Sequence, residues 1–559
     1  MKFCIALVFL GLANLSWQHD DSPRVKTALG CLKGSHKASH SGRKYAAYEG
    51  VPYAQPPVGK LRFQPPQPVE KWDKELPATR KGSVCTQYLM NANSDGDRVT
   101  GCEDCLYINI YVPETNNSKL LPVMFWIHGG AYQFGSGNEA DEKFIMDRDV
   151  IFVTVNYRLG PFGFLSTGDS VVPGNMGLKD QSMALLWVSK HIENFGGNSQ
   201  NITIFGMSAG GSSVHYQYLT PWSAGLFQRG ISISGVATDP WPQTERAPEK
   251  AKELGALMGC PTNNSTKMVL CLQERPPLFL AQAVGKFMAW LYNPFTPFGP
   301  VIDKYADKPF INKSPIEIIA NGEAADLPWI SGVVSEEGLY PAAQFVDNDE
   351  LLEQLDSGWD EIAKYLLDFN DTIPLEEQVK VSQKIRKQYL GSKKINKETV
   401  MPVIHMVGDR LFAVDFEEVA RLQAKVHKSP VWTYYYSYRA MRSLSDRLGG
   451  NGKNFGVSHG DDIFLILEPV VSNTSRPEDM QMQELLVDFY TGFAIEGEAH
   501  FGNAKWKTLN PSDKKFHYLH IRNPHNISMG CNDNFAQKKF WNTIPFNENK
   551  LCRRHSFSD

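Results

Sequence analysis

The chain has 559 residues and a mass of 62.8 kDa, a length compatible with roughly two to four domains or with one large α/β enzyme. Hydrophobic residues make up 42% of the sequence and charged residues 21%, which excludes a disordered chain, a collagen and a coiled coil. The net charge is -4 and the pI is near 6.4. Nucleic-acid binding requires a basic excess, so we expect no nucleic-acid partner.

The first residues predict a secretory leader. Met1-Lys2 is positively charged, an apolar run follows over residues 3–12, and small and then polar residues come next. This pattern is typical of a signal peptide over residues 1–18, cleaved between about residues 13 and 18, with a buried N-terminal helix as the alternative. No later segment offers about 18 consecutive apolar residues, and the C-terminus carries no KDEL-type signal. We therefore expect a secreted mature chain, residues 19–559, without a membrane span.

The cysteines fit an oxidising compartment, because eight of the nine remain once the leader with Cys4 is removed. Short spacing predicts two local disulfides, Cys85–Cys105 and Cys260–Cys271. Cys102 and Cys105 also match a CxxC metal motif, but no second CxxC completes a metal site, so we favour a disulfide and expect no metal. Four cysteines can pair in three ways that the sequence leaves open: Cys31, Cys102, Cys531 and Cys552.

Sequons predict N-linked glycans at several positions. Asn201 lies against a predicted core strand and Pro315 follows the Asn312 sequon, which disfavours both. The expected acceptors are Asn116, Asn263, Asn264, Asn370, Asn473 and Asn526.

Strand and helix signals alternate along the N-terminal half of the chain. Short apolar runs predict buried strands at residues 123–127, 150–155, 202–205, 231–234 and 329–334. Asp180 is well placed as the N-cap of a helix that follows the second of these strands. Alternation at this spacing predicts a mostly parallel sheet with helices on both faces.

The C-terminal half continues the same pattern. Residues 347–397, rich in Glu, Lys, Asp and Leu, predict surface helices beside the sheet, residues 431–438 an aromatic strand, and residues 480–494 a helix. The sequence contains no internal repeat, low-complexity tract or Pro/Gly/Ser linker. We therefore expect one large α/β domain over residues 19–559.

Residues 206–210, Gly-Met-Ser-Ala-Gly, match G-x-S-x-G between a predicted strand and a predicted helix. The glycines permit a sharp turn that leaves the hydroxyl of Ser208 exposed at the helix N-terminus. A structural turn is the alternative for such a motif. The flanking strand and helix favour a nucleophile.

A serine hydroxyl is a weak nucleophile that needs a base, and the base needs an orienting acid. In α/β hydrolases these follow in the order Ser, Asp/Glu, His. Glu337 directly follows the predicted strand ending at Val334, and its neighbour Glu336 is the alternative acid. His459, in a predicted loop further along the chain, is the candidate base.

The tetrahedral intermediate of acyl transfer needs preorganised backbone donors. His128-Gly129-Gly130-Ala131 follows a predicted strand and matches the HGGG-type loop that supplies them, together with the N–H of Ala209. A phosphate-binding glycine loop is the alternative reading. It fails because no GKS/T or GxGxxG motif follows.

Together these motifs resemble type-B carboxylesterases of the cholinesterase/carboxylesterase superfamily over essentially the whole mature chain. The resemblance rests on residues 205–211 (FGMSAGG), 103–109 (EDCLYIN), 155–160 (VNYRLG) and 540–545 (FWNTIP). Within the family the sequence is most similar to insect esterases of the aphid E4 and α-esterase kind. They share the methionine before the nucleophile and the stretch at residues 293–300, NPFTPFGP.

The resemblance implies an α/β-hydrolase fold and assigns roles to particular residues. The implied triad is Ser208, Glu337 and His459, and the implied oxyanion donors are Gly130, Ala131 and Ala209. The family also implies ion pairs between Arg62 and Glu103 and between Arg158 and Asp180, and the same two disulfides, Cys85–Cys105 and Cys260–Cys271. The implied wall of the acyl pocket includes Trp241, Phe295 and Phe298.

Departures from the family pattern refine the expected substrate. Cholinesterases carry a glutamate before the nucleophile, where this chain has Met207, and a tryptophan in the first disulfide loop, where residues 85–105 contain none. Without them the binding of quaternary ammonium groups loses about 2 kcal/mol or more. Juvenile hormone esterases usually carry glutamine at the position of Met207. Ala131 replaces the third oxyanion glycine and adds a methyl group.

The sequence therefore predicts a secreted serine carboxylesterase that hydrolyses neutral, hydrophobic esters through an acyl-enzyme on Ser208. It needs no cofactor, and organophosphates and carbamates are expected inhibitors. The alternatives are a hormone-specific or lipase-like esterase and, from a different class, a binding, sequestering or adhesion protein on the same fold.

Overall fold

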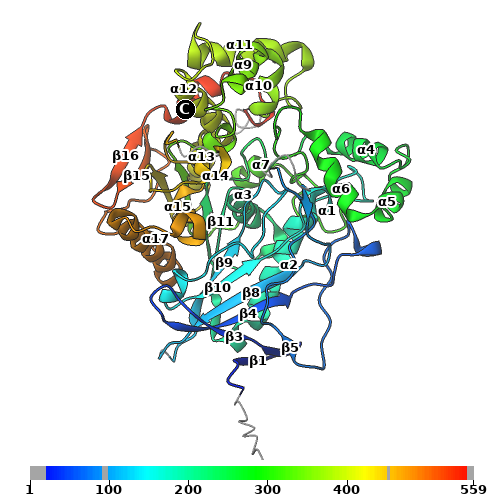
Figure 1. Cartoon of the computed structure of the whole chain (residues 1–559), viewed down its shortest axis with the longest axis vertical. Coiled ribbons are helices and arrows are strands. Elements are labelled where there is room, and N and C mark those ends of the chain that lie inside the picture. The colour runs from blue at the N-terminus through cyan, green and yellow to red at the C-terminus, as the bar shows by residue number, and fades with distance from the viewer. Residues whose placement is uncertain (1–19, 91–97, 117, 450–452, 550–559) are drawn as a thin grey trace, which may run out of the picture.

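A computed structural model describes residues 20–90, 98–116, 118–449 and 453–549. Within these residues, eleven strands form one mixed sheet that runs through the molecule (Figure 1). In spatial order the strands are β16 (Asn526–Asn532), β15 (Phe516–Asn523), β14 (Val431–Tyr436), β13 (Trp329–Val334), β12 (Arg229–Ile233), β11 (Gly197–Met207), β9 (Leu121–Ile127), β10 (Ile151–Val155), β8 (Tyr107–Pro113), β4 (Lys44–Pro52) and β3 (Ser35–Ala38).

The centre of this sheet is parallel. Every neighbouring pair from β10 through β9, β11, β12, β13 and β14 to β15 runs parallel, while β8, β4 and β3 at one edge and β16 at the other pair antiparallel. The six predicted strands are confirmed as β9 to β14, although β14 ends at Tyr436 rather than at residue 438. The carboxyl ends of β9, β11 and β13 meet at one edge, where ligands bind in such sheets.

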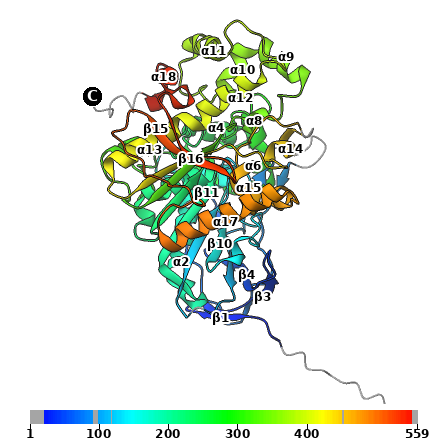
Figure 2. The same ribbon diagram turned by 90° about the vertical axis from the view of Figure 1, so that its left-hand side faces the viewer.

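Side chains of β9 alternate between two separate hydrophobic cores, because successive residues of a strand point to opposite faces. Val123, Phe125 and Ile127 lie in one core, on the side of α2 (Met176–His191) and α3 (Ala209–Leu219). Met124 and Trp126 lie in the other core, under α17 (Pro477–Glu496), which crosses the sheet in Figure 2. Helices thus cover both faces, and the helix predicted at residues 480–494 is confirmed as α17.

The expectation that Asp180 caps a helix is wrong. α2 begins at Met176, after Asn175 in the left-handed region at φ 64°, and Asp180 lies inside it, fully buried. Its carboxylate accepts hydrogen bonds from the Arg158 guanidinium at 2.7 and 2.8 Å, as the family resemblance implies. A buried carboxylate needs such a partner, since burial alone raises its pKa.

The second implied ion pair is also present. The guanidinium of Arg62 donates to both carboxylate oxygens of Glu103, at 2.5 and 2.6 Å. Another guanidinium nitrogen of Arg62 donates to the carbonyl of Leu272 at 2.9 Å. The pair therefore ties the first disulfide loop to the helix that carries Cys271.

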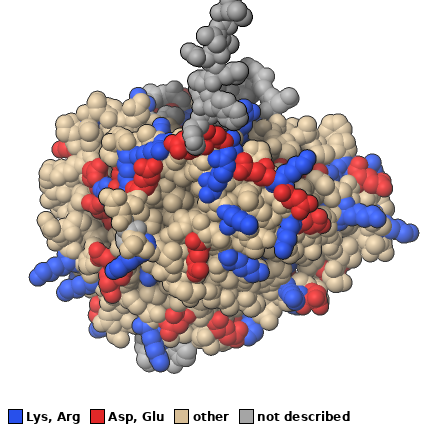
Figure 3. Space-filling view, turned by 90° about the horizontal axis from the view of Figure 1, so that it is seen from below, with Lys and Arg blue, Asp and Glu red and all other residues tan. Residues whose placement is uncertain are grey.

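The predicted surface helices between residues 347 and 397 form α9 (Asp349–Ser357), α10 (Trp359–Leu366) and α11 (Leu375–Leu390). With α12 (Val400–Gly408) they gather at one end of the molecule (Figure 1). Leu352, Leu355 and Trp359 bury the apolar sides of the first two helices. In Figure 3, Lys and Arg are interspersed with Asp and Glu over the face shown.

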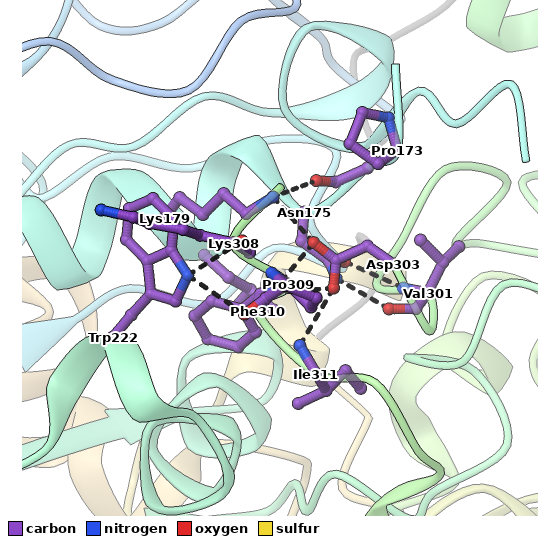
Figure 4. Close-up of polar contacts among 12 residues, drawn as sticks. Pro173, Asn175, Lys179, Trp222, Val301, Asp303, Lys308, Pro309, Phe310 and Ile311 are labelled. Carbon is purple, nitrogen blue, oxygen red and sulfur yellow. Dashed lines mark hydrogen bonds and ion pairs between the residues drawn. The ribbon is translucent and has the colours of Figure 1, made fainter. Parts of the chain in front are cut away.

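A buried ion pair holds the chain that follows Phe298. The ammonium of Lys179, in α2, lies 2.7 Å from the carboxylate of Asp303, and both side chains are at most 1% exposed (Figure 4). The same carboxylate accepts the backbone N–H groups of Phe310 and Ile311 at 2.9 to 3.0 Å. Because each charge is compensated by the other, this contact fixes the segment to α2.

Both predicted disulfides are present, Cys85–Cys105 and Cys260–Cys271. Since Cys105 is oxidised, it does not act with Cys102 as a CxxC metal motif. Cys31, Cys102 and Cys531 are thiols in the described part of the chain, and Cys552 lies outside it, as does the predicted leader. None of the helices in the described ranges has both the length and the apolar character needed to cross a bilayer.

Candidate active site

Ser208 lies at the turn between β11 and α3 with φ 60° and ψ -123°, a conformation that non-glycine residues rarely adopt. Its N–H donates to the carbonyl of Ile233 at 2.8 Å, which fixes the turn to β12. The turn is tight, because a Cβ on Gly210 would lie 2.0 Å from the carbonyl oxygen of Ile127. The G-x-S-x-G sequence therefore forms the strained turn that its pattern predicts.

Glu337 and His459 meet in the structure, although 122 residues separate them. One carboxylate oxygen of Glu337 lies 2.6 Å from Nδ1 of His459. The other accepts the hydroxyl of Ser234 at 2.6 Å and the N–H of Val334 at 2.8 Å. Two donors thus fix this carboxylate so that its remaining oxygen faces the imidazole. The carboxylate of Glu336, the alternative acid, instead accepts the hydroxyl of Ser335 and the N–H of Val457.

The imidazole of His459 is buried and enclosed by aromatic rings. Tyr340 stacks on it with ring centroids 5.4 Å apart, and Phe412 lies against it at 4.5 Å. Among the described residues, Nε2 of His459 has no hydrogen-bond partner. This nitrogen is therefore free to take a proton from a group in the neighbouring cavity, whose wall His459 shares with Ser208.

The loop after β9 lies beside the turn that carries Ser208. Gly130 has φ 107° and Ala131 φ 53°, and a Cβ on Gly129 would lie 3.1 Å from Cβ of Ser208. Within the described residues, the backbone N–H groups of Gly130, Ala131 and Ala209 have no acceptor. Uncommitted backbone donors of this kind are suited to a developing negative charge on oxygen.

His128, which opens this loop, is buried and stacks on Tyr157 with ring centroids 4.4 Å apart. Burial lowers its pKa to about 4. The imidazole is therefore neutral near neutral pH and adds no positive charge to the loop.

A cavity of about 290 Å³ opens on Ser208 and His459. Its inner wall is apolar and includes Trp126, Met207 and Phe464. Charged side chains also line it, namely Glu139, Arg447 and Glu468, with 3.6 Å between the guanidinium of Arg447 and the carboxylate of Glu468. Sequence reasoning missed these three, because they come from separate segments that no spacing rule connects.

The residues expected to bound the acyl pocket are buried but do not line this cavity. Trp241 contacts Phe295 with ring centroids 5.7 Å apart, and Phe295 in turn contacts Tyr340 at 5.3 Å. Phe298 packs against Phe287. Trp241 lines a second cavity of about 390 Å³, and Ala131 is buried outside the first one. Phe295 thus lies behind Tyr340, and Trp241 lies behind Phe295 and Phe412.

His215, on α3, is a buried histidine outside the cavity. Its Nδ1 accepts the N–H of Ala237 at 3.1 Å, so its Nε2 carries the proton and donates to the side-chain oxygen of Gln423 at 3.1 Å. Burial lowers the pKa of His215 to about 3. A second proton would place an N–H against the N–H of Ala237. This histidine therefore has a structural role as a neutral imidazole.

The lowered pKa of His215 predicts that the free energy of unfolding decreases at acidic pH. Because the folded pKa lies below the unfolded value of about 6.5, the stabilisation is complete above pH ~6.5 and is lost as pH falls toward ~3, by roughly 5 kcal/mol in all. Between pH 7.5 and pH 4.5, the free energy of unfolding measured with urea should fall by about 2 to 3 kcal/mol less in His215→Gln than in the wild type. His500→Gln, at an exposed histidine, is the control. Equal losses in wild type and His215→Gln would contradict this assignment.

The sheet order, the strained serine turn and the Glu337–His459 contact define an α/β hydrolase. A solved structure of juvenile hormone esterase from Manduca sexta, with OTFP covalently attached, superposes with a TM-score of 0.82 at 26% identity, covering 94% of this chain and 99% of that one. Venom carboxylesterase-6 of Apis mellifera is 63% identical over 99% of both chains, and esterase E4 of Myzus persicae is 36% identical over 88% of this chain and 89% of that one.

The model of the carboxylesterase family matches residues 21–541. The chain belongs to the carboxylesterase family, and it is a carboxylic ester hydrolase. The sequence-based family and fold predictions are thereby confirmed.

Proposed function

We propose that this protein hydrolyses neutral, hydrophobic carboxylic esters through an acyl-enzyme on Ser208. The observation that carries the proposal is the contact between Glu337 and Nδ1 of His459, with Nε2 unpartnered beside the cavity that Ser208 lines. This arrangement suits a general base whose tautomer is fixed by a carboxylate.

In the proposed first step, Oγ of Ser208 attacks the ester carbonyl while Nε2 of His459 takes the hydroxyl proton. The N–H groups of Gly130, Ala131 and Ala209 stabilise the oxyanion. His459 then gives the proton to the departing alkoxide, which leaves as the alcohol. Water attacks the acyl-enzyme with His459 again as base, and the carboxylic acid and free Ser208 are formed.

The cavity wall supports the class of substrate. Trp126, Met207 and Phe464 present apolar surface beside Ser208, and burying the ester there contributes about 25 cal/mol per Å² of apolar area. Arg447 pairs with Glu468 at 3.6 Å, and burial raises the pKa of Glu139, which lies near the same guanidinium, so both carboxylates attract a quaternary ammonium group less than free carboxylates would. Organophosphates should phosphorylate the same serine, and carbamates should carbamoylate it.

Matched alcohols test the substrate class. We expect kcat/KM for 3,3-dimethylbutyl acetate to exceed that for acetylcholine, its cationic isostere, by at least about tenfold, because the apolar wall gives the cation little to offset its desolvation. The Met207→Glu variant, which places a carboxylate beside the nucleophile, should shift this ratio toward acetylcholine. A wild-type preference for acetylcholine would overturn the substrate assignment even if the triad is correct.

We also propose that the protein is secreted. The leader pattern, the two disulfides and the likeness to a protein named venom carboxylesterase support an extracellular site. Five of the expected glycan acceptors are exposed and Asn370 is half-buried; the exposed ones are Asn116, Asn263, Asn264, Asn473 and Asn526.

A further inference from the structure

Glu336, the residue before the triad acid, contacts the loop that carries His459. Its carboxylate oxygen Oε2 accepts the backbone N–H of Val457, two residues before His459, at 2.7 Å. Its own backbone N–H donates to the carbonyl of Val457 at 3.1 Å, and Glu336 forms a parallel bridge with Ser458. Side chain and main chain of one residue therefore hold the loop at the same point.

The loop has little intrinsic stiffness on either side of this contact. Gly456 has φ 120° and Gly460 φ 85°, so glycines in unusual conformations flank residues 457–459. The Glu336 carboxylate lies directly against Gly456, where a Cβ would come within 2.3 Å of Oε2. Asp461 accepts the N–H of Ser458 at 2.8 Å from the other side. The position of His459 therefore depends on two carboxylates, those of Glu336 and Asp461, which accept the N–H groups of the two residues before it.

The turn that carries Glu336 is itself fixed. α12 packs against it so closely that a Cβ on Gly338 would lie 1.9 Å from the carbonyl oxygen of Ile404. The Glu336 side chain is 16% exposed, and its second oxygen lies 3.9 Å from Nε2 of His405, beyond hydrogen-bond range. The tight packing of α12 therefore holds the turn that carries Glu336 in a fixed position beside the loop of residues 456–460.

The Glu336 carboxylate is ionised at neutral pH. Burial alone would raise its pKa, but His405, the hydroxyl of Ser335 and the N–H of Val457 together hold the pKa below its usual value. A charged acceptor forms a stronger hydrogen bond to a backbone N–H than a neutral one. The negative charge of Glu336 therefore strengthens its hydrogen bond with the N–H of Val457 at neutral pH.

We propose that Glu336 is a positioning residue, which holds the loop of residues 456–460 so that Nε2 of His459 stays directed at Ser208. The inference rests on the proposed function, in which Ser208 and His459 carry the reaction. Glu336 itself touches neither the substrate nor the imidazole. Its contribution lies in the geometry of the base, and displacement of a catalytic group by about 1 Å can cost about a hundredfold in rate.

The test compares two substitutions at this position. Glu336→Ala should lower kcat for p-nitrophenyl butyrate by about ten- to a hundredfold with KM within about threefold, because the substrate cavity is unchanged. Glu336→Gln, whose amide oxygen still accepts from Val457, should stay within about threefold of wild type in kcat. The rate constant for phosphonylation of Ser208 should fall in Glu336→Ala, while the final titre of reactive serine stays at one per chain.

His405→Gln is the matched control, since it removes the imidazole beside the same carboxylate but leaves the bond to Val457. Its kcat should stay within about threefold of wild type. If His405→Gln loses as much as Glu336→Ala, or if Glu336→Gln is not rescued, the loop contact is not what matters and the proposal is wrong. A lowered serine titre in soluble Glu336→Ala would also overturn it, because the defect would then be one of folding.

Gly456→Ala gives a second route if Glu336→Ala does not fold. The added methyl group would displace the Glu336 carboxylate, so kcat should fall with KM unchanged, and a wild-type kcat would contradict the proposal. In the Glu336→Ala background, if that chain is obtained, the same change should cost less. The outcomes separate two failures, since an active Ser208→Ala variant would refute the proposed function, whereas an inactive Ser208→Ala with fully active Glu336→Ala would refute only the positioning role.

Discussion

Ser208→Ala should lower kcat for p-nitrophenyl acetate and butyrate by roughly three to six orders of magnitude. Under the proposed mechanism the variant lacks the oxygen that forms the acyl-enzyme, and the proposed oxyanion donors, Gly130, Ala131 and Ala209, would alone provide only residual catalysis. Steady-state hydrolysis and burst titration with a phosphonate ester measure the effect. The burst should be absent in the variant and stoichiometric in the wild type.

The same substitution should leave the fold intact. Alanine keeps the Cβ of Ser208, which packs near Gly129, and adds no strain beyond that of the positive φ already present. The free energy of unfolding should therefore change by less than about 1 kcal/mol. If the folded variant keeps more than a few per cent of the activity, or if chelators abolish the wild-type activity, the serine mechanism is refuted.

The elements that sequence predicted well are those with a local signature. The strands that became β9 and β11 are short apolar runs bounded by glycine, and the motif around Ser208 combines a strand, a fixed glycine spacing and a helix. Each of these signals lies within about 15 consecutive residues. The sequence alone therefore predicts the strained turn at Ser208 and the edge of the sheet at which this turn lies.

The features that sequence did not reveal depend on distant contacts. Asp180 reads locally as an N-cap, and only the family resemblance pointed to its partner Arg158, which lies 22 residues earlier in the loop between β10 and α1. Ser234, which donates to the Glu337 carboxylate, follows a strand with no motif around it. Such roles arise only when the order of strands in the sheet is known, because that order brings the ends of β12 and β13 together.

The shape of the cavity is the least predictable part of the site. Family resemblance suggests Trp241 and Phe295 as pocket walls, but Tyr340 lies between Phe295 and the His459 imidazole. Cavity walls depend on side-chain packing across several loops, which a linear pattern does not encode. Backbone geometry is easier to anticipate, since the positive φ angles of the loop after β9 follow its glycine-rich sequence.

Glu337→Gln should lower kcat by about 10³- to 10⁴-fold with little change in stability, because of the tautomer it imposes. The hydroxyl of Ser234 and the N–H of Val334 both donate to one oxygen of Glu337, so the glutamine must place its carbonyl there. Its NH₂ group then faces Nδ1 of His459, which becomes an acceptor and moves the ring proton to Nε2. A protonated Nε2 does not accept a proton from Ser208.

Glu336→Gln, one residue earlier in the same turn, is the matched control and should keep at least about a third of the wild-type kcat. Near-normal kcat in Glu337→Gln, measured with p-nitrophenyl butyrate, would refute the tautomer argument, and an equal loss in the control would show that the turn rather than the carboxylate is responsible.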